Sequence, residues 1–294
     1  MDWFDALSPL DYRYYGRDKY VFEKISPYLS ENARISYQAK VEAAYLKGLA
    51  KHGVASAKAA QEIQKAASNV SAEAVYQEED RVRHDIRALV NVMKQDMGHS
   101  AKPFVHLGAT SNDIINTADA LRFQDFTKNA LLPELLLLEK TIINIARTEK
   151  STLQIGRTHG QHAEPLTFGF ALAEYVSRLG GRIQALESAG NNLRGKISGA
   201  VGAYNATSLL VHDPEALEKD VLHSLGLKPA SHSKQVVEPE HALDLLHAIT
   251  SAFGVLANLA DDLRHLQRTE IAEVGEAFGT DQVGSSTMPH KRNP

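Results

Sequence analysis

Two histidines and a threonine lie together in the segment 156–165, which reads Gly-Arg-Thr-His-Gly-Gln-His-Ala-Glu-Pro. Because imidazole titrates near neutral pH, His159, which follows Thr158 on a glycine-flanked loop, is suited to acid–base catalysis. Two histidines three residues apart could also bind a metal, but the sequence has no HExxH pattern and no cysteine to complete such a site. We therefore expect acid–base chemistry and no metal here, with a structural role open for His162.

A second polar segment, 105–113, reads Val-His-Leu-Gly-Ala-Thr-Ser-Asn-Asp and precedes a long apolar run. Thr110, Ser111 or Asp113 can cap the helix that this run predicts. A helix N-terminus with extra hydroxyl groups is also suited to bind a carboxylate or a phosphate. The two interpretations are compatible, and both stay open at this point.

A third segment, 284–294, reads Gly-Ser-Ser-Thr-Met-Pro-His-Lys-Arg-Asn-Pro. Its glycine and paired serines are typical of a mobile loop, while Lys291 and Asn293 offer a cation and an amide to an anion. Composition alone favours a disordered basic tail over a binding loop.

The composition excludes several classes of protein. The 294 residues are 43% hydrophobic, which is ample for a buried core, and the formal net charge of -4 argues against non-specific nucleic-acid binding. The absence of cysteine excludes disulfides and thiolate metal sites and fits a reducing compartment. The N-terminus lacks the features of a signal peptide, and no stretch approaches the uninterrupted apolar length of a membrane span. We expect a cytoplasmic protein without a membrane segment or a cofactor.

Helical patterns cover most of the chain. Apolar residues recur at three and four positions over 35–70, with a break near Gly53, and a further helical run is expected over 72–97. The segments 117–150 and 166–193 are rich in Leu and Ala, and each would be about 40–50 Å long as a helix. Pro133 should kink the first of these unless 129–132 already form a break.

Another long helix is expected from residue 239 onwards. Its apolar residues keep a spacing of three and four and predict a bundle seam at Leu243, Leu246, Ile249, Phe253, Leu256, Ala260 and Leu263. Strand signals are weak throughout. We therefore expect an all-α fold, with a small N-terminal helical domain over 1–110, a long-helix bundle over 111–294 and irregular connections at 196–208 and 275–294.

The order of residues in 284–294 resembles the signature loop of the aspartase/fumarase superfamily. The segments 106–113 and 157–164 are similar to the other two characteristic regions of that superfamily, in the same order along the chain. The resemblance implies β-elimination of fumarate, with Ser285 as the general base on a closing loop and His159 as the general acid. The residues that it implies as ligands of the substrate carboxylates and the fumarate moiety are Thr110, Ser111, Thr158, Ser286, Lys291 and Asn293.

Within the superfamily the chain is most similar to the adenylosuccinate lyase family. Arg13 and Tyr14 resemble the pair with which that family holds the nucleotide phosphate, and the segment 83–85 resembles its histidine-bearing substrate element. The further substrate-binding residues that the resemblance implies are Arg83, His84, Asp85, His106 and Gln235. The sequence departs from the family at 238–241, where Glu-Pro-Glu-His replaces an Arg-rich stretch.

The resemblance also implies a homo-oligomer of four chains, with each site built from three subunits. Because the chain stops directly after the signature, we expect a truncated sequence that lacks the C-terminal domain of the family. Alternative interpretations are a sister lyase, such as an argininosuccinate lyase or a carboxymuconate cycloisomerase relative, and a non-catalytic derivative of the scaffold. Arg13, Tyr14 and His84 argue against the sister lyases, while Ser285 and His159 argue against the non-catalytic derivative.

Overall fold

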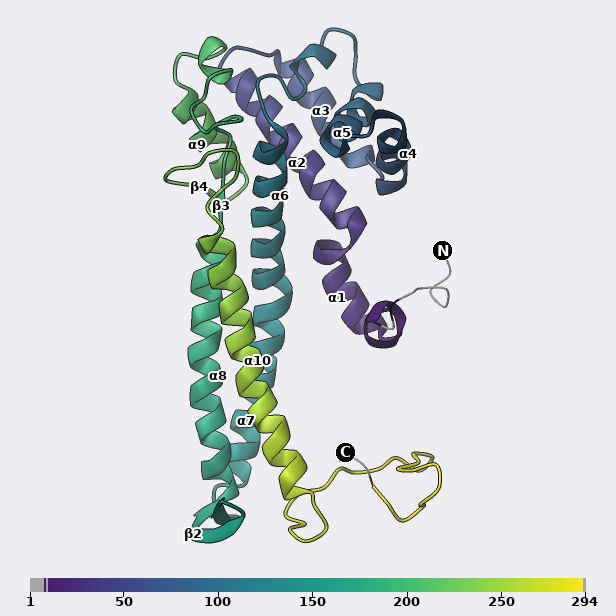
Figure 1. The fold of residues 1–294 in the computed structure, drawn as a ribbon, viewed down its shortest axis with the longest axis vertical. Coiled ribbons are helices and arrows are strands. Elements are labelled where there is room, and N and C mark those ends of the chain that lie inside the picture. Colours follow the sequence, from purple (N-terminus) through teal and green to yellow (C-terminus); the bar gives the residue numbers. More distant parts are fainter. Residues whose placement is uncertain (1–7, 9, 293–294) are drawn as a thin grey trace. The chain divides into compact units, whose positions relative to one another are not determined.

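The computed structural model describes residue 8 and residues 10–292 (Figure 1). The chain forms two compact units, one of residues 1–133 and 187–245 and the other of residues 134–186 and 246–294. The expected division at residue 110 does not coincide with the boundaries of these units, because helix α6 (Ser111–Phe126) packs against helix α2 (Glu31–Lys51) of the N-terminal segment.

The first unit is built from short and medium-length helices. Besides α2 and α6 they are α1 (Lys19–Leu29), α3 (Ala57–Asn69), α4 (Ala72–Val82), α5 (Asp85–Gln95) and α9 (Pro214–Ser224). Three of them start at serine N-caps: Ser30, Ser56 and Ser71 each accept the backbone N–H three residues on, at 3.1–3.2 Å. The sequence encodes these helix starts locally, because a hydroxyl satisfies one of the unpaired N–H groups of the first turn.

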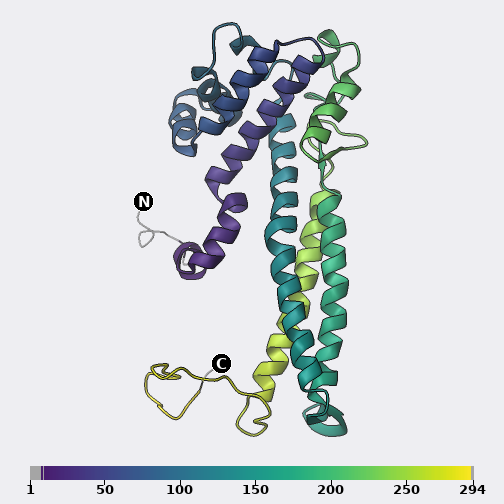
Figure 2. The same ribbon diagram turned by 180° about the vertical axis from the view of Figure 1, so that it is seen from behind.

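Helix α2 is the centre of the first unit and packs against α3, α6 and α9. Tyr45, Leu46 and Leu49 on α2 have no exposed surface. A Cβ added to Gly48 would lie 2.5 Å from the side chain of Val221 on α9, so a glycine is needed where the two helices approach. Figure 2 shows α2 and α6 from the opposite side.

The single helical run expected over 72–97 is wrong, because the run is broken into α4 and α5. Arg83 has a left-handed backbone with φ 57°, and its N–H bonds the carbonyl of Glu79. His84 then acts as the N-cap of α5, with Nδ1 accepting from the N–H of Arg87 at 3.4 Å. The charged segment 83–85 is therefore a turn between two helices.

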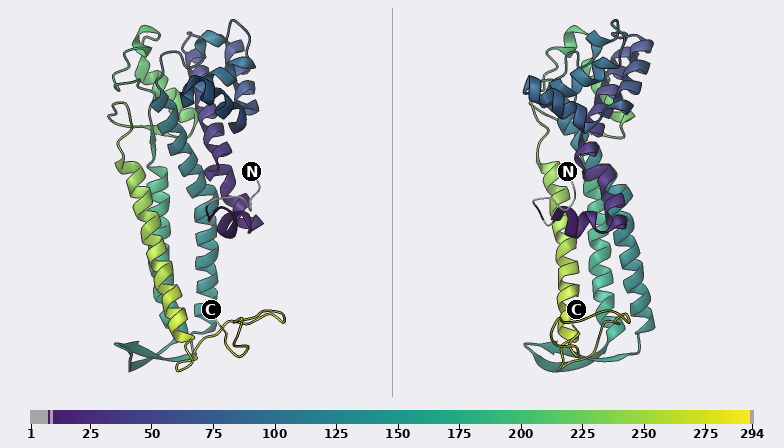
Figure 3. Two further views of the ribbon diagram at one scale, coloured as in Figure 1. Left: turned by 45° about the vertical axis from the view of Figure 1, so that its right-hand side comes forward. Right: turned by 90° about the vertical axis from the view of Figure 1, so that its right-hand side faces the viewer.

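The second unit consists mainly of three long helices and one hairpin. The helices are α7 (Leu132–Thr148), α8 (Phe168–Asn191) and α10 (Glu240–Leu266), and the hairpin strands are β1 (Leu153–Thr158) and β2 (Gln161–Thr167). Figure 3 shows α8 and α10 running side by side. Polar pairs join them in antiparallel order: Arg178 donates to Asn258 at 2.8 Å, Arg182 donates to Ser251 at 3.2 Å, and Tyr175 donates to Asp262.

The expected break near Pro133 is present as a π-helical segment, Thr127–Leu131, directly before α7. The N–H of Leu132 bonds the carbonyl of Thr127, five residues back. This wider turn precedes Pro133, which has no N–H of its own to donate.

The apolar seam predicted on α10 is not buried within the described part of the chain. Leu246 and Phe253 are 60% and 69% exposed, whereas Ala248, Ala252 and Val255 form the buried face. Helix α10 is also the one helix among the described residues that is long and apolar enough to cross a membrane by length and composition, which the sequence analysis did not expect. Such helices are also common in soluble bundles, so this is weak evidence for a span.

The all-α prediction is confirmed, since the strands of the described residues form only two small sheets. The hairpin β1–β2 is antiparallel, and β3 (Arg194–Gly195) pairs in parallel with β4 (Lys228–Pro229). The hairpin was not expected, because its sequence lacks a sustained alternation of apolar and polar residues.

Candidate active site

His159 and Thr158 lie at the tip of the β1–β2 hairpin. Thr158 pairs with Gln161, which leaves His159 and Gly160 as a two-residue loop with φ values of 53° and 72°. Positive φ at both loop positions is the geometry that joins two antiparallel strands tightly, and glycine is favoured at the second of them. The hairpin therefore presents an exposed histidine on a tight two-residue loop.

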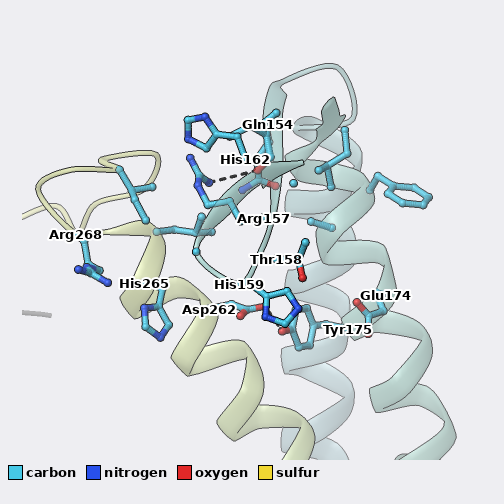
Figure 4. Close-up of a pocket in the computed structure, with 18 of the residues that line it drawn as sticks. Gln154, Arg157, Thr158, His159, His162, Glu174, Tyr175, Asp262, His265 and Arg268 are labelled. Atoms are coloured by element: carbon cyan, nitrogen blue, oxygen red, sulfur yellow. Dashed lines mark hydrogen bonds between the residues drawn. The ribbon is translucent and has the colours of Figure 1, made fainter. Parts of the chain in front are cut away.

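The hairpin forms one wall of a cleft of about 1090 Å³ within the second unit (Figure 4). The other walls come from α8, which contributes Tyr175, and from the end of α10, which contributes Asp262 and His265. Figure 4 shows His159 on the side of the cleft with Tyr175 and Asp262, while His162 lies on the other side with Gln154. The two histidines of the motif thus have different surroundings.

A carboxylate ties the hairpin to the chain that follows α10. Arg157 donates to Glu273 at 2.5 Å, and Gln154 donates to the second carboxylate oxygen at 3.0 Å. The hydrogen bond from Arg157 lowers the pKa of Glu273 in spite of partial burial. Ala272 has a left-handed backbone with φ 52°, and the N–H of Glu273 bonds the carbonyl of Leu266, so the turn after α10 aims this side chain at β1. Sequence analysis missed Glu273, and no local signal identified it.

Ser285, Ser286 and Lys291 lie in the loop that extends from the end of α10 (Figure 3). The Ser285 hydroxyl oxygen accepts from the N–H groups of Thr287 at 3.4 Å and Met288 at 3.2 Å. A Cβ on Gly284 would lie 2.1 Å from the carbonyl oxygen of Lys291, so the two ends of the motif touch. Ser286 and Lys291 are exposed, and Asn293 lies outside the described residues. None of Ser285, Ser286 and Lys291 lines the cleft that contains His159.

The segment 106–113 belongs to the first unit. Thr110 is the N-cap of α6, and Asp113 accepts the N–H of Thr110 at 2.9 Å. Thr110 and Ser111 are half-buried at this helix N-terminus. The capping interpretation is confirmed, because Thr110 and Asp113 cap the first turn of α6, while anion binding by the hydroxyl groups at this turn stays a prediction.

Asp113 also makes a buried ion pair with Lys196, which sequence analysis missed. Both side chains have at most 1% exposed surface, and the Lys196 ammonium additionally donates to the carbonyl of Gly199 at 2.9 Å. Thr117 on α6 both accepts from and donates to the backbone of Lys196, at 3.0 and 2.9 Å. These bonds hold the irregular segment from residue 196 against α6. A lysine near a glycine in a loop is ordinarily solvated, so the sequence contains no signal for this pair.

His106 is paired with a second buried carboxylate that sequence analysis missed. Its Nδ1 lies 2.6 Å from Glu42 on α2, and Glu42 has no exposed surface. Burial alone would lower the pKa of His106, but the charge and hydrogen bond of Glu42, helped by Asp113, outweigh burial and raise it. The sequence signal that could have identified this pair is Glu42 itself, because a glutamate at an apolar position of an amphipathic helix needs a buried partner.

The other expected substrate-binding residues are exposed, except for Asp85, which is half-buried. Arg13 and Tyr14 lie on the π-helical turn Leu10–Gly16, where Tyr14 is 61% exposed. His84 and Asp85 form the start of α5, and Gln235 lies on the connection that leads to α10. The predicted residues thus belong to three different segments: Thr158 and His159 to the hairpin, Ser285, Ser286 and Lys291 to the loop, and His106, Thr110 and Ser111 to the start of α6 and the residues before it.

Candidate metal ligands do not cluster in the described part of the chain. Over residue 8 and residues 10–292, no group of three or more His, Cys, Asp or Glu side chains could hold a metal ion. The groups suited to chemistry are instead an exposed imidazole, a serine hydroxyl that accepts amide hydrogen bonds, and an imidazole paired with a carboxylate.

The fold places the chain among long-helix lyases. It superposes on a fumarate lyase from Mesorhizobium sp. BNC1 with a TM-score of 0.77 and 25% identity, over 85% of this chain and 58% of that one. It also superposes on a 3-carboxy-cis,cis-muconate lactonizing enzyme from Pseudomonas putida with a TM-score of 0.80 and 25% identity, over 92% and 60% of the two chains. A family model described as Lyase matches residues 13–294, and the chain belongs to this family.

The curated relatives of the chain include adenylosuccinate lyases. The chain is 38% identical over 289 residues to an adenylosuccinate lyase of Archaeoglobus fulgidus and 37% identical over 292 residues to one of Pyrococcus abyssi. In each case the match covers 98% of this chain and 62% of the relative. The chain therefore spans somewhat less than two thirds of the length of these curated relatives.

Proposed function

We propose that the chain is part of an adenylosuccinate lyase, which eliminates fumarate from adenylosuccinate to give AMP. The same chemistry would release fumarate from succinyl-aminoimidazole carboxamide ribotide in purine nucleotide biosynthesis. The observation that carries the proposal is the identity of 37–38% to adenylosuccinate lyases over 98% of this chain. Membership of the lyase family supports the reaction class independently.

In the proposed reaction His159 is the general acid. When the C–N bond breaks, the departing nitrogen needs a proton, and an imidazole at the tip of the hairpin can supply it near neutral pH. Thr158, its neighbour on β1, would donate a hydrogen bond to a carboxylate of the leaving fumarate. The exposed position of His159 supports this role, because the imidazole is accessible to a substrate.

Ser285 is the proposed general base, which removes the carbon-bound proton. A serine hydroxyl is a weak base at neutral pH, so its alkoxide form has to be stabilised where it acts. The two backbone N–H groups directed at its oxygen, from Thr287 and Met288, favour the negatively charged form. The Lys291 ammonium and the Asn293 amide are proposed to hold the carboxylates of the dianionic intermediate on the same loop.

The remaining residues are proposed to bind the anionic ends of the substrate. Thr110 and Ser111 offer hydroxyl groups at the N-terminus of α6, where the helix dipole favours an anion. Arg13, Tyr14 and the 83–85 turn would bind the nucleotide phosphate, with His106 and Gln235 as further contacts. No metal or cofactor is needed for this elimination, because acid, base and charge stabilisation come from side chains.

Purified protein incubated with adenylosuccinate tests the proposal directly. We expect the ultraviolet absorbance of the substrate to fall as AMP and fumarate form, and chromatography should identify both products in equal amounts. Argininosuccinate and 3-carboxymuconate serve as comparison substrates, since the solved relatives include a muconate lactonizing enzyme. Turnover of either comparison substrate with none of adenylosuccinate would reject the proposed substrate and leave the lyase family intact.

Arg13→Ala is expected to raise KM for adenylosuccinate by about tenfold or more with little change in kcat. The reason is that a phosphate contact far from the breaking bond stabilises ground and transition states alike. Arg17→Ala, on another exposed arginine four residues on, is the matched control and should leave KM near the unsubstituted value. Equal effects of the two substitutions, or none from Arg13→Ala, would reject the assignment of Arg13.

We also propose a cytoplasmic homotetramer in which helices of several chains form a shared core. The exposed apolar residues of α10 support association, because burying them would remove apolar surface from water. Light scattering should give the mass of four chains, and Leu246→Glu combined with Phe253→Glu should dissociate the assembly. Leu209→Glu, at an 86% exposed position in the other unit, is the control and should leave the mass unchanged. A monomeric unsubstituted protein would contradict this proposal.

A further inference from the structure

We propose that Glu42 is a positioning residue that keeps the imidazole of His106 protonated, so that Nε2 presents a positive charge to an anionic group of the substrate. The chemical class of the ligand is a phosphate or a carboxylate. This inference rests on the proposed function for the substrate, but the protonation of His106 can be measured without any enzymatic turnover.

The burial of the pair supports a charged imidazole. Nδ1 of His106 lies 2.6 Å from one carboxylate oxygen of Glu42, within hydrogen-bond distance. Glu42 is completely buried, and its second carboxylate oxygen has no hydrogen-bond partner in the described part of the chain. An ionised carboxylate in such a place is stable only beside a positive charge, and His106 is the cation-forming group in contact with it.

Two other charges near His106 act in opposite directions. Asp113 on α6 adds negative charge, but it is already paired with Lys196. Lys94 on α5 opposes protonation of His106. The phenol of Tyr45 donates to the carbonyl of Leu107 at 2.7 Å and carries no charge. Glu42 is therefore the group that decides the protonation state.

The backbone places this imidazole next to the N-terminus of α6. His106 has φ 62°, a left-handed conformation that is unfavourable for a residue with a side chain. Two hydrogen bonds with side chains of α2 hold this conformation in place. Glu42 bonds the His106 ring, and the Tyr45 hydroxyl donates to the carbonyl of Leu107. With Nδ1 bound to Glu42 and the side chain 22% exposed, Nε2 is the nitrogen left to meet a ligand.

A purely structural pair would have the same distance but a different protonation state. If Glu42 carries the proton, it donates to a neutral His106, and the pair fills the interior without offering a charge. The two cases differ in the pH at which the imidazole titrates. They also differ in the response of His106 to anions, because a neutral ring attracts a phosphate only weakly.

The first measurement is the titration of His106 by NMR of the imidazole ring in the unsubstituted protein, with the signal assigned by its loss in His106→Asn. We expect the midpoint to lie above the ordinary histidine value of about 6.5. Glu42→Gln should move the midpoint to lower pH, whereas Lys94→Met should move it to higher pH. Glu73→Gln, which removes an exposed carboxylate on α4, should leave it unchanged. A midpoint at or below the ordinary value in the unsubstituted protein overturns the proposal, even if Glu42→Gln fails to fold.

The second measurement is binding of inorganic phosphate, AMP and fumarate, followed by the same ring signals. At least one of these anions should shift the His106 signal, and affinity should fall as pH rises through the midpoint of His106. Glu42→Gln should weaken binding about tenfold at pH 7 and move the fall in affinity to lower pH. A raised midpoint with no response to any of the three anions overturns the role in binding. If His106 behaves as expected but adenylosuccinate is not cleaved, the proposed function fails and this inference stands.

Discussion

His159→Ala and Ser285→Ala are each expected to lower kcat for fumarate release by about 10²–10⁴-fold while adenylosuccinate still binds. Each substitution removes a proton-transfer group and little binding surface, so the loss should fall on kcat and not on KM. Steady-state kinetics together with a direct binding measurement separate the two effects. His162→Ala, three residues along the same hairpin but on the other side of the cleft, is the matched control and should have a much smaller effect.

The same two variants test whether one site draws on several chains. Ser285 does not line the cleft that contains His159, although both residues belong to the same compact unit. If the acid and the base of one site come from different chains, hybrid oligomers of the two inactive variants should regain part of the activity. Verified hybrids that stay inactive would mean that one chain supplies both groups or that they do not act together.

The second large effect is expected at the buried ion pair of Lys196 and Asp113. Lys196→Met should lower the free energy of unfolding by about 3–5 kcal/mol, because it leaves a buried carboxylate without its cation. The substitution should also loosen the segment from residue 196, since the lysine ammonium holds the carbonyl of Gly199 as well. Urea denaturation measures the stability, and hydrogen exchange at Ile197 and Gly199 reports on the segment.

Two further variants make this prediction specific. Lys219→Met removes an exposed partner of Glu215 on α9 at 3.8 Å and should change stability by less than about 1 kcal/mol. Combining Lys196→Met with Asp113→Leu should restore part of the loss, because no unpaired charge is then left in the interior. A double variant that is less stable than Lys196→Met alone would contradict this explanation and would assign the effect to the hydrogen bonds of Asp113.

Local sequence signals are sufficient where a side chain satisfies a helix end or stops a helix. The serine caps at Ser30, Ser56 and Ser71, and the break before Pro133, depend on groups within a few residues, so the sequence contains the information. The break at Arg83 was missed, because a left-handed arginine has no strong local signal. The β1–β2 hairpin was missed for a similar reason, since a His-Gly loop is less distinctive than Asn-Gly or Asp-Gly.

The sequence by itself determined the all-α class, the long helices and the polar motifs that resemble those of a fumarate-releasing lyase. These features are set by side-chain periodicity and by residue order, which need no knowledge of distant contacts. Only the tertiary structure decided which buried charges meet: Glu42 with His106, Asp113 with Lys196, and Glu273 with Arg157. It also decided which face of α10 is buried, at Ala248, Ala252 and Val255. The residues of these pairs are 64 to 116 positions apart in the sequence, so their contact depends on how helices and loops pack. The sequence around a carboxylate does not identify the residue that packing places beside it.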